Sequence, residues 1–408
     1  QIIIPNNYVP SKGIERIANK LGIYITAVHK DNLLDYLTYY DNRPYMENSA
    51  LANLDELVVD DSYVEREEPF KTGYESPFSR NRILFGAPGT GKSFTINSDR
   101  MELLGKDNED DYERVTFHPD YSYANFVGTY KPVPTIDSDG KDAITYEYVP
   151  GPFMRVYVNA LKSSRTDNVK PFLLIIEEIN RANVAAVFGD IFQLLDRDDD
   201  FVSEYPIQAT EDVKKYLARE LGGDPYDYNK IKIPDNMFIW ATMNSADQGV
   251  FPMDTAFKRR WDFTYLGIDD NDQNLQGKYV YLADDKSQKV EWNKLRKAIN
   301  NFLAKEKINE DKQLGPYFIS RSIVVPKTGT EIDRDRFINT FKNKVIMYLF
   351  EDAAKQKRAR LFEGCFQNNS RYSEICREFE AKGVKIFNHD IQLDCEVEDA
   401  KSSDTTQE

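Results

Sequence analysis

The sequence has few of the residues that bind transition metals or form disulfide bonds. It contains three histidines and three cysteines in 408 residues, and neither set has the close spacing of a zinc site. The cysteines, Cys365, Cys376 and Cys395, lie far apart in the C-terminal part of the chain. That pattern favours free thiols in a reducing cytosol. The composition therefore argues against a zinc site, and we expect a cytoplasmic protein.

Long hydrophobic runs and an excess of positive charge are also missing. No apolar run approaches the roughly 20 residues that cross a bilayer, and the first residues lack the pattern of a secretion signal. The formal net charge is −15. Phosphate binding draws on clustered Lys and Arg, so this charge argues against a general affinity of the surface for DNA or anionic lipid. It is compatible with a local basic stripe inside a ring or channel.

The pattern along the chain divides it into four segments. Residues 1–80 are weakly patterned, acidic toward their end, and carry no chemistry that we can assign. Over 81–266 predicted strands and helices alternate, which is typical of a mostly parallel sheet flanked by helices. Over 267–365 the pattern becomes mainly helical, with apolar faces of period 3.6. Residues 366–408 are expected to form a C-terminal extension that ends in a disordered tail.

The first motif follows a predicted strand and opens a predicted helix. It matches the G-x-x-x-x-G-K-[ST] phosphate loop. Its glycines let backbone N–H groups curve around a polyphosphate, and the following helix presents its positive N-terminal end. The Lys is expected to neutralise the β and γ phosphates, and the Ser hydroxyl to enter the Mg²⁺ shell. The predicted nucleotide-binding residues are Gly86, Pro88, Gly89, Thr90, Gly91, Lys92 and Ser93.

The second motif is an apolar run that stops at two carboxylates. Residues 173–176 are Leu-Leu-Ile-Ile, and Glu177 and Glu178 follow them. Such a run predicts a strand buried on both faces, and parallel sheets bind ligands at the carboxyl ends of their strands. Beside a phosphate loop, we expect Glu177 to hold the Mg²⁺ shell and Glu178 to act as general base on the attacking water. Taken alone, the stretch equally fits a strand that runs into a solvated turn.

A third predicted strand ends on polar residues. The segment Asn-Met-Phe-Ile-Trp-Ala-Thr-Met precedes Asn244, and Asp247 comes three residues later. A polar side chain at the end of an apolar strand is what a sensor of the γ-phosphate or of the attacking water requires. A turn-forming Asn-Ser pair is the alternative for an isolated stretch. The order of the three motifs along the chain favours the sensor interpretation.

Two arginines follow at the end of a predicted helix. Lys258 precedes Arg259 and Arg260, and an arginine supplied to a neighbouring subunit's γ-phosphate stabilises transition-state charge. Simple pairing of basic side chains with the C-terminal end of the helix is the alternative. The sequence does not separate the two arginines.

This succession of motifs resembles the order found in AAA+ NTPases. The sequence is similar to the McrB-type motor subunits of modification-dependent restriction systems over residues 116–132, 146–153, 177–196 and 243–263. Residues 314–319 and 345–352 look like the C-terminal lid of that family. The likeness covers roughly residues 80–365, and the blocks Glu-Ile-Asn-Arg-Ala-Asn and Met-Asn-Ser-Ala-Asp are specific in combination.

The resemblance implies an αβα AAA+ core with a mainly parallel sheet, followed by a smaller helical lid domain. It also implies a homo-oligomer, a hexameric ring with nucleotide sites between subunits. Family members couple hydrolysis, typically of GTP, to DNA translocation and to a McrC-type nuclease partner. In such a ring Asn180 and Arg181 would lie near the interface. DNA would be engaged through the complex, without any membrane.

The sequence departs from the family pattern at two positions. Glu177 stands where the family normally has Asp, and Pro316 stands where the lid motif more often has His-Ser. The N-K-x-D pattern by which Ras-like GTPases recognise guanine is absent. AAA+ proteins do not depend on that pattern, so the substrate is expected to be GTP or ATP, with Mg²⁺ as cofactor.

Three hypotheses of function follow. The first is an NTP-hydrolysing ring motor of a McrBC-like DNA restriction or phage-defence system. The second is a protein-remodelling ATPase similar to MoxR-type chaperones, without DNA. The third is an assembly scaffold that nucleotide controls and that turns over little, which Glu177 in place of Asp makes conceivable. Mg²⁺-dependent turnover, and its response to DNA, separates them.

Overall fold

The computed structural model describes residues 69–106, 108–136, 140–244, 250–366 and 371–399. It also describes the backbone of two short strands, β1 (Ile2–Pro5) and β2 (Ile25–Val28), which pair in parallel. The contacts between Cα atoms divide the chain into two compact units, Gln1–Glu67 and Glu68–Glu408. The second unit contains every motif of the sequence.

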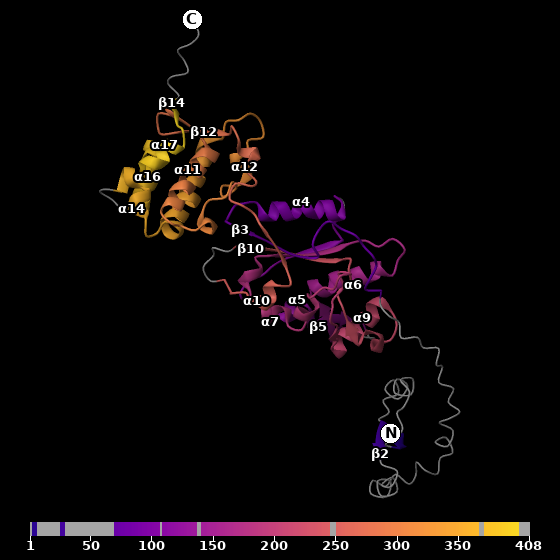
Figure 1. Ribbon diagram of the computed structural model, residues 1–408. Coiled ribbons are helices and arrows are strands. Elements are labelled where there is room, and N and C mark those ends of the chain that lie inside the picture. The colour runs from indigo at the N-terminus through magenta and orange to yellow at the C-terminus, as the bar shows by residue number, and fades with distance from the viewer. Residues whose placement is uncertain are drawn as a thin grey trace. The chain divides into compact units, whose positions relative to one another are not determined.

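The centre of the second unit is a five-stranded sheet (Figure 1). Its strands follow the order β11 (Asp262–Tyr265), β3 (Asn81–Gly86), β10 (Met237–Asn244), β7 (Phe172–Glu177) and β4 (Tyr112–Thr116). All four pairings are parallel, so the carboxyl ends of the strands meet at one edge. The predicted α/β fold with a mainly parallel sheet is confirmed.

Both faces of the sheet are covered, as the apolar run in β7 predicts. Leu174 and Ile176 belong to one hydrophobic core, and Leu173 and Ile175 to another. This alternation follows from the two-residue period of a strand. Figure 1 shows the helix α4 (Lys92–Leu104) on one face of the sheet, and α5 (Tyr123–Phe126), α6 (Pro152–Ser164) and α7 (Val184–Phe188) on the other.

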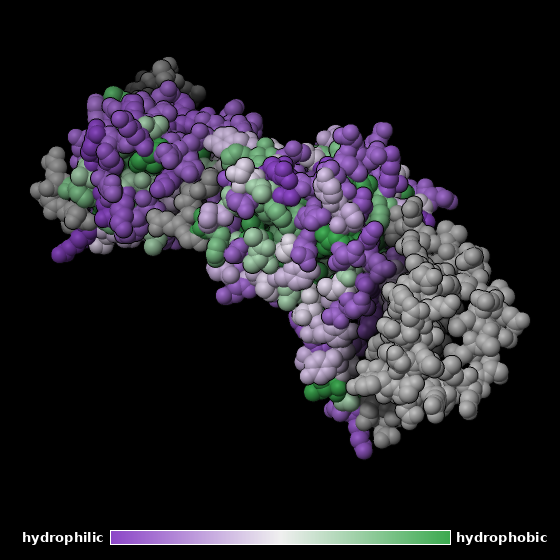
Figure 2. All heavy atoms as spheres, turned by 60° about the horizontal axis from the view of Figure 1, so that its bottom comes forward, coloured by the Kyte–Doolittle hydropathy of each residue, from purple (hydrophilic) through white to green (hydrophobic). Residues whose placement is uncertain are grey.

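Several shorter elements connect the strands. Between β4 and β7 the chain forms an antiparallel hairpin of β5 (Gly128–Ile136) and β6 (Asp142–Pro150). Between β7 and β10 it forms α8 (Ile191–Leu194), β8 (Ile207–Gln208), α9 (Glu211–Leu221) and β9 (Lys230–Ile231). The helix α10 (Thr255–Lys258) precedes β11. Figure 2 turns the α5–α6–α7 side of the sheet forward and shows apolar patches among polar side chains.

Residues 69–80 pack against the sheet rather than forming a separate linker. The carboxylate of Asp235 accepts hydrogen bonds from the backbone N–H groups of Thr72 and Gly73 at 2.8 Å each. The indole N–H of the buried Trp240 donates to the carbonyl oxygen of Ser79 at 2.9 Å, and the Phe78 ring packs on the same indole. The predicted boundary at residue 80 therefore falls inside a segment that belongs to the core.

The remainder of the chain is mainly helical, as the apolar periodicity predicts, and has its own hydrophobic core. Its helices are α11 (Trp292–Lys305), α12 (Arg321–Val324), α13 (Arg334–Thr340), α14 (Arg358–Leu361), α15 (Glu363–Phe366), α16 (Tyr372–Lys382) and α17 (His389–Asp394). Two π-helical segments, Phe341–Ile346 and Leu349–Ala353, lie between α13 and α14. A small antiparallel sheet joins β12 (Tyr279–Leu282), β13 (Gln288–Glu291) and β14 (Glu398–Asp399).

The helical core continues past the predicted boundary at residue 365. Phe379, Phe387 and Ile391 belong to the same buried cluster as the residues of α11, and β14 pairs with β13. From residue 400 onward, the predicted disordered tail lies outside the described residues. We call residues 267–399 the lid.

The three cysteines are all free thiols. Burial raises the pKa of Cys365 and of Cys395 to about 11, so both thiols stay protonated at neutral pH. Thiolates rather than thiols are the reactive form. Among the helices that the structure describes, none combines the length and the apolarity needed to span a membrane.

Candidate functional site

The predicted phosphate loop joins β3 to α4 at the carboxyl edge of the sheet. Gly86 is the last residue of β3, and Lys92 is the first residue of α4. Gly89 and Gly91 adopt φ of 79° and 94°, a left-handed conformation that side chains disfavour. The N-terminal end of α4 thus faces the loop, where its orphan N–H groups and helix dipole favour an anion.

Polar side chains of the loop turn back onto its own backbone. The Lys92 ammonium group donates to the carbonyl oxygens of Gly86 at 2.9 Å and Ala87 at 3.0 Å. The Thr90 hydroxyl is fully buried and donates to the Ala87 carbonyl at 3.0 Å. These bonds hold the loop in a curved shape before any phosphate enters, and the Lys92 side chain extends across the inside of the curve.

Glu177 lies beside Ser93, as the order of the motifs predicts. The Ser93 hydroxyl lies 3.2 Å from Glu177 Oε2, and the Thr242 hydroxyl donates to the same oxygen at 2.5 Å. Thr242 is on the neighbouring strand β10, two residues before Asn244. Three elements therefore converge on one carboxylate oxygen. The opposite oxygen, Glu177 Oε1, forms an ion pair with Arg114 Nη1 of β4 at 2.9 Å.

The donor set around Ser93 and Glu177 fits Mg²⁺. A hydroxyl and a carboxylate are hard oxygen ligands, and Mg²⁺ in phosphate sites uses one or two such groups with water and phosphate oxygens completing its shell. Within the described ranges, no cluster of three or more His, Cys, Asp and Glu side chains could hold a metal by itself.

Glu178 has a strained backbone and a defined partner. Its φ and ψ of 56° and 47° are left-handed, which is uncommon for residues other than glycine and occurs preferentially at functional sites. Its Oε1 accepts a hydrogen bond from the Asn244 side-chain amide at 2.6 Å. Its Oε2 lies 3.4 Å from Arg181 Nε. The predicted general base and the predicted sensor are thus in direct contact.

Asn180 holds the segment behind the two glutamates. Its side-chain amide donates to the backbone carbonyl of Asn244 at 2.8 Å, and its own backbone carbonyl accepts from the Phe251 N–H at 2.8 Å. Asn180 is buried, so it connects the ends of β7 and β10 rather than facing outward. Asp247, the second predicted residue of the sensor strand, lies outside the described residues.

Two segments of the lid touch the phosphate loop. The N–H groups of Gly315 and Tyr317 donate to the carbonyl oxygens of Pro88 and Gly89 at 3.0 and 2.8 Å. The side-chain amide of Asn271 donates to the Thr90 carbonyl at 2.8 Å. The phosphate loop is therefore bonded to the lid through its backbone.

One buried arginine joins these two lid segments. Arg296 of α11 is fully buried, and burial lowers the pKa of its guanidinium. It donates to the carbonyl oxygens of Ile268 at 3.1 Å and Leu314 at 3.0 Å, and pairs with Asp269 at 2.5 Å. Ile268 and Leu314 lie next to the two lid segments that reach the phosphate loop. The guanidinium therefore fixes the position of one lid segment relative to the other.

The two predicted finger arginines are not brought to this site. Both pair with Asp196: Arg260 at 2.6 Å and Arg259 at 3.4 Å. The Arg260 side chain is 9% exposed and stacks on Phe192, whereas the Arg259 side chain is 64% exposed. The structure thus separates two residues that the sequence did not.

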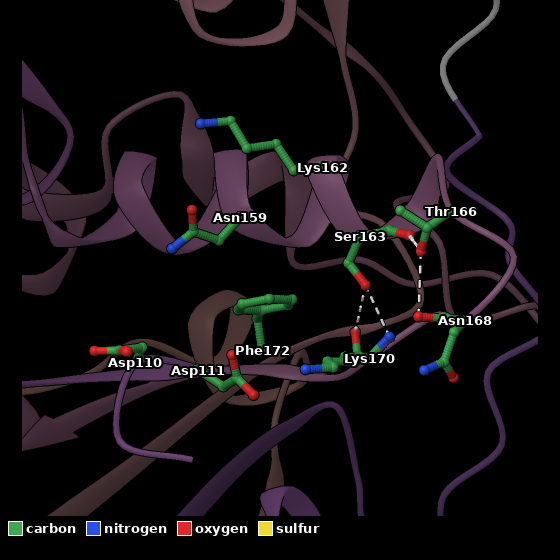
Figure 3. Close-up of a pocket in the computed structure, with 9 residues that line it drawn as sticks. All are labelled: Asp110, Asp111, Asn159, Lys162, Ser163, Thr166, Asn168, Lys170 and Phe172. Atoms are coloured by element: carbon green, nitrogen blue, oxygen red, sulfur yellow. Dashed lines mark hydrogen bonds between the residues drawn. The ribbon is translucent and has the colours of Figure 1, made fainter.

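A hollow lies at the opposite, amino edge of the sheet (Figure 3). Its volume is about 430 Å³, and its lining residues are Asp110, Asp111, Asn159, Lys162, Ser163, Thr166, Asn168, Lys170 and Phe172. The Ser163 hydroxyl accepts from the Lys170 N–H at 2.8 Å, and the Thr166 hydroxyl donates to the Ser163 carbonyl at 2.7 Å. These groups stabilise the turn after α6, and none of the predicted site residues is among them.

The sequence interpretation missed three parts of the carboxyl edge: Thr242, Arg114 and the lid contacts. Thr242 could have been found, because it is two residues before Asn244 and so shares its face of the strand. Arg114 gives no local signal, since its contact depends on the pairing of β4 with β7. The same holds for Asn271 and Gly315, which are distant from the phosphate loop in the chain.

Comparisons with known proteins agree with this architecture. Residues 81–261 match the model of a family described as AAA domain (dynein-related subfamily). The Type II restriction enzyme BsuMI component YdiS of Bacillus subtilis (strain 168) is 43% identical, over 76% of this chain and 89% of that one. The likeness to the solved structure of NtrX from Brucella abortus, at 12% identity over 76% of this chain and 57% of that one, has a TM-score of 0.25 and supports no inference.

A second relative is more distant. The Type IV methyl-directed restriction enzyme EcoKMcrB subunit of Escherichia coli (strain K12) is 29% identical over 45% of this chain and 34% of its own length. The predicted resemblance is confirmed, since the matched family and both relatives agree with it. This chain belongs to the AAA+ ATPases of the McrB type.

Proposed function

We propose that the chain is a Mg²⁺-dependent nucleoside triphosphatase, with GTP or ATP as substrate, and the motor subunit of a McrBC-like restriction system. The observation that carries the proposal is the contact between Glu178 and Asn244, at 2.6 Å, beside a phosphate loop. A general base needs an oriented carboxylate within reach of the attacking water. Glu178 directly follows β7 and Asn244 ends the neighbouring strand β10, and both adjoin the loop that would hold the phosphates.

Each residue then has a distinct role. The backbone N–H groups of the loop from Gly86 to Gly91 would surround the phosphates, and Lys92 would leave its carbonyl partners to bind the β and γ phosphates. Ser93 and Glu177 would hold Mg²⁺, which supplies charge neutralisation when bound. Glu178 would accept the proton of the water, and Asn244 would orient that water or the γ-phosphate. Asp247 remains a candidate for the same sensor.

The position of Arg259 supports a site shared between copies. Asp262, the first residue of β11, pairs with Arg82, four residues before Gly86, so it lies roughly 13 Å from the phosphate loop along the strand. Arg259 comes before that strand and is exposed. It therefore lies away from its own site, and we propose that it acts on the site of a neighbouring subunit. Arg260 is the weaker candidate, because Asp196 and Phe192 hold it inside the subunit.

A homo-oligomer follows from this arrangement, and we propose the hexameric ring of McrB-type proteins. The printed names of both relatives describe restriction enzyme components, which supports a McrC-type nuclease partner and DNA engaged through the complex. We assign residues 81–266 to the nucleotide-binding domain and residues from 267 to the lid, and we assign no role to residues 1–80. A cytoplasmic location accords with free thiols.

Steady-state phosphate release tests the proposal. The purified chain is assayed with GTP and with ATP, each with and without Mg²⁺. We expect Mg²⁺-dependent release with at least one of them. In the variant Glu178→Gln we expect release to fall at least 100-fold, because the amide cannot accept a proton, while binding of a fluorescent nucleotide is retained. Turnover that is the same in this variant and in the wild type would remove Glu178 from the mechanism.

The same assay separates the competing functions. Phosphate release that rises when DNA and the partner nuclease are added favours the restriction motor. Phosphate release that neither addition changes favours a protein-remodelling ATPase. Nucleotide-dependent assembly of the chain without release above background, even with partner and DNA, would favour a scaffold.

A further inference from the structure

The ion pair between Arg114 and Glu177 lies in the proposed phosphate site, and the proposed mechanism assigns no role to Arg114. Glu177 is largely buried, with 14% of its side chain exposed, and Arg114 is 33% exposed. The guanidinium contacts Glu177 Oε1 at 2.9 Å, while Ser93 and Thr242 contact Oε2 at 3.2 and 2.5 Å. The carboxylate is thereby fixed from both sides, with one oxygen committed to Arg114 and the other facing Ser93.

The side chains of Arg114 and Glu177 are long enough to meet between adjacent strands. Arg114 pairs in register with Ile175, two residues before Glu177, so both side chains emerge on the same face of adjacent strands. The guanidinium has to extend along the strand to reach the carboxylate. An Asp at position 177 would end about 1.5 Å nearer the backbone, one C–C bond shorter. Glu at this position therefore suits a partner that approaches from β4.

We propose that Arg114 is a positioning residue for the metal-binding carboxylate: it holds Glu177 with one oxygen turned toward Ser93. This proposal rests on the proposed Mg²⁺-dependent site. The ion pair carries no net charge, so the edge attracts Mg²⁺ less than a lone carboxylate would. Outer partners of metal-binding carboxylates fix their orientation. Arg114 thus weakens the attraction of the carboxylate for the metal but orients the oxygen that would bind it. With this partner, the longer Glu177 side chain can take the role that an Asp has in the family pattern.

The preceding residue of the same strand supplies a matched control. Glu113 of β4 forms an ion pair with Arg155 through two hydrogen bonds of 2.6 Å. By the strand period, Glu113 points to the opposite face of the sheet from Arg114. Arg155 contacts Glu113 and the Pro150 carbonyl but has no bond to the phosphate loop or the two glutamates. Removing it deletes an arginine–carboxylate pair of β4 without touching the site.

The experiment uses the full chain and four variants: Arg114→Met, Arg155→Met, Glu177→Asp and the double variant Arg114→Met/Glu177→Asp. Binding of fluorescent non-hydrolysable analogues of GTP and ATP is titrated against Mg²⁺, and turnover is measured in parallel. For Arg114→Met we expect turnover to fall about tenfold. We also expect the Mg²⁺ concentration that gives half-maximal nucleotide binding to fall about two- to threefold. The reason is that the variant lacks a cation next to the carboxylate, and screened charge interactions give a change of this size.

The other variants decide between positioning and general damage. Arg155→Met is expected to change neither quantity. In the Glu177→Asp background, Arg114→Met is expected to lower turnover no further, since the shorter carboxylate no longer reaches the guanidinium. Arg114→Lys restores the positive charge and is expected to bring the Mg²⁺ requirement back to that of the wild type. Variants whose thermal unfolding midpoint matches the wild type are compared.

Three results would overturn the proposal: equal losses in Arg114→Met and Arg155→Met, a full additional loss in the double variant, or a raised Mg²⁺ requirement in Arg114→Met. Failure of the proposed function gives a different result. A chain that binds the analogues in a Mg²⁺-dependent way but releases no phosphate leaves the binding titration to decide the role of Arg114. Binding that does not respond to Mg²⁺ at all refutes both.

Discussion

The two edges of the five-stranded sheet contain the same types of polar residue but use them differently. At the carboxyl edge, Glu177 and Glu178 bond to the side chains of Ser93, Thr242 and Asn244. Side chains of this kind can change partners when a phosphate, a metal or a water arrives. The hydrogen bonds at this edge are therefore compatible with chemistry as well as with folding.

At the amino edge, polar side chains bond mainly to the backbone. Arg80 is buried and donates to the carbonyl oxygens of Asp235 at 2.5 Å and Tyr74 at 2.6 Å. Asn81 is buried and donates to the carbonyl of Leu195 at 2.8 Å. Arg197 donates to four backbone carbonyls, and burial lowers its pKa to about 9, so it stays charged at neutral pH. These side chains are held inside the protein by backbone acceptors, and they serve the fold.

Arg259 is the exception at the amino edge, and it gives the largest expected effect. Its side chain is exposed, whereas that of the adjacent Arg260 is held by Asp196 and Phe192. If Arg259 completes the site of a neighbour, Arg259→Ala should lower turnover about 1,000-fold, the lower range for an arginine that stabilises transferred phosphate. Steady-state phosphate release measures this change, and nucleotide binding should remain.

Arg260→Ala is the matched variant for that comparison. It removes an internal ion pair and a stacked guanidinium, so we expect a lower unfolding temperature with turnover per folded molecule within a few-fold of wild type. Mixing Arg259→Ala with Glu178→Gln subunits adds a further test. Sites that combine an intact glutamate with an intact arginine should recover part of the activity. An outcome in which Arg260→Ala alone abolishes turnover would reverse the assignment.

Arg80 gives the next largest effect, this time on stability. In Arg80→Met the carbonyl oxygens of Asp235 and Tyr74 lose their donor, and the guanidinium no longer stacks 4.5 Å from the Phe201 and Phe238 rings. We expect the free energy of unfolding to fall by about 3 kcal/mol, the sum of unsatisfied carbonyls and a lost cation–π contact. Urea denaturation followed by tryptophan fluorescence measures it.

Arg155→Met is again the control, because its ion pair with Glu113 is 45% and 28% exposed. Exposed pairs contribute about 0–1 kcal/mol. A cost in Arg80→Met no greater than that in Arg155→Met would mean that the two edges differ less than their hydrogen bonds indicate.

Much of the carboxyl edge was predictable because its signals are local. The glycine spacing of residues 86–91 fixes the loop, and the strand period places the last residues of β7 and β10 at the same edge. The contact between Glu178 and Asn244 follows from strand ends that meet in a parallel sheet. The mainly parallel sheet itself follows from the alternation of strand and helix patterns, and that prediction is confirmed.

The rest depends on contacts between distant segments. Nothing near Arg114 in the chain indicates that β4 lies beside β7, and nothing near Asp196 indicates that it binds Arg260 more closely than Arg259. The boundary at residue 80 failed to include Ser79 and Phe78 in the core, because their partner, Trp240, lies 161 residues after Ser79. The acidic residues toward the end of the segment 1–80 are typical of a linker, but the packing of residues 69–80 on the sheet makes them part of the core.

Gly315 tests whether the carboxyl edge extends into the lid, with the smallest expected effect. A Cβ at this position would lie 2.3 Å from the carbonyl carbon of Gly89 and 2.4 Å from the Thr90 nitrogen. Gly315→Ala must therefore push the lid segment off the phosphate loop, breaking the bonds from Gly315 and Tyr317 to the loop. We expect nucleotide affinity to fall about tenfold, or about 1.4 kcal/mol, measured with a fluorescent analogue.

Pro316→Ala changes the same segment without adding a clash. The Pro316 carbonyl, which accepts from the Trp292 indole at 3.1 Å, remains in place, so affinity should change less than twofold. If Gly315→Ala binds nucleotide as tightly as Pro316→Ala, the lid contact is incidental to binding. The site would then end with the sheet, and the bonds from Asn271, Gly315 and Tyr317 would, like those of Arg80 at the opposite edge, serve only the fold.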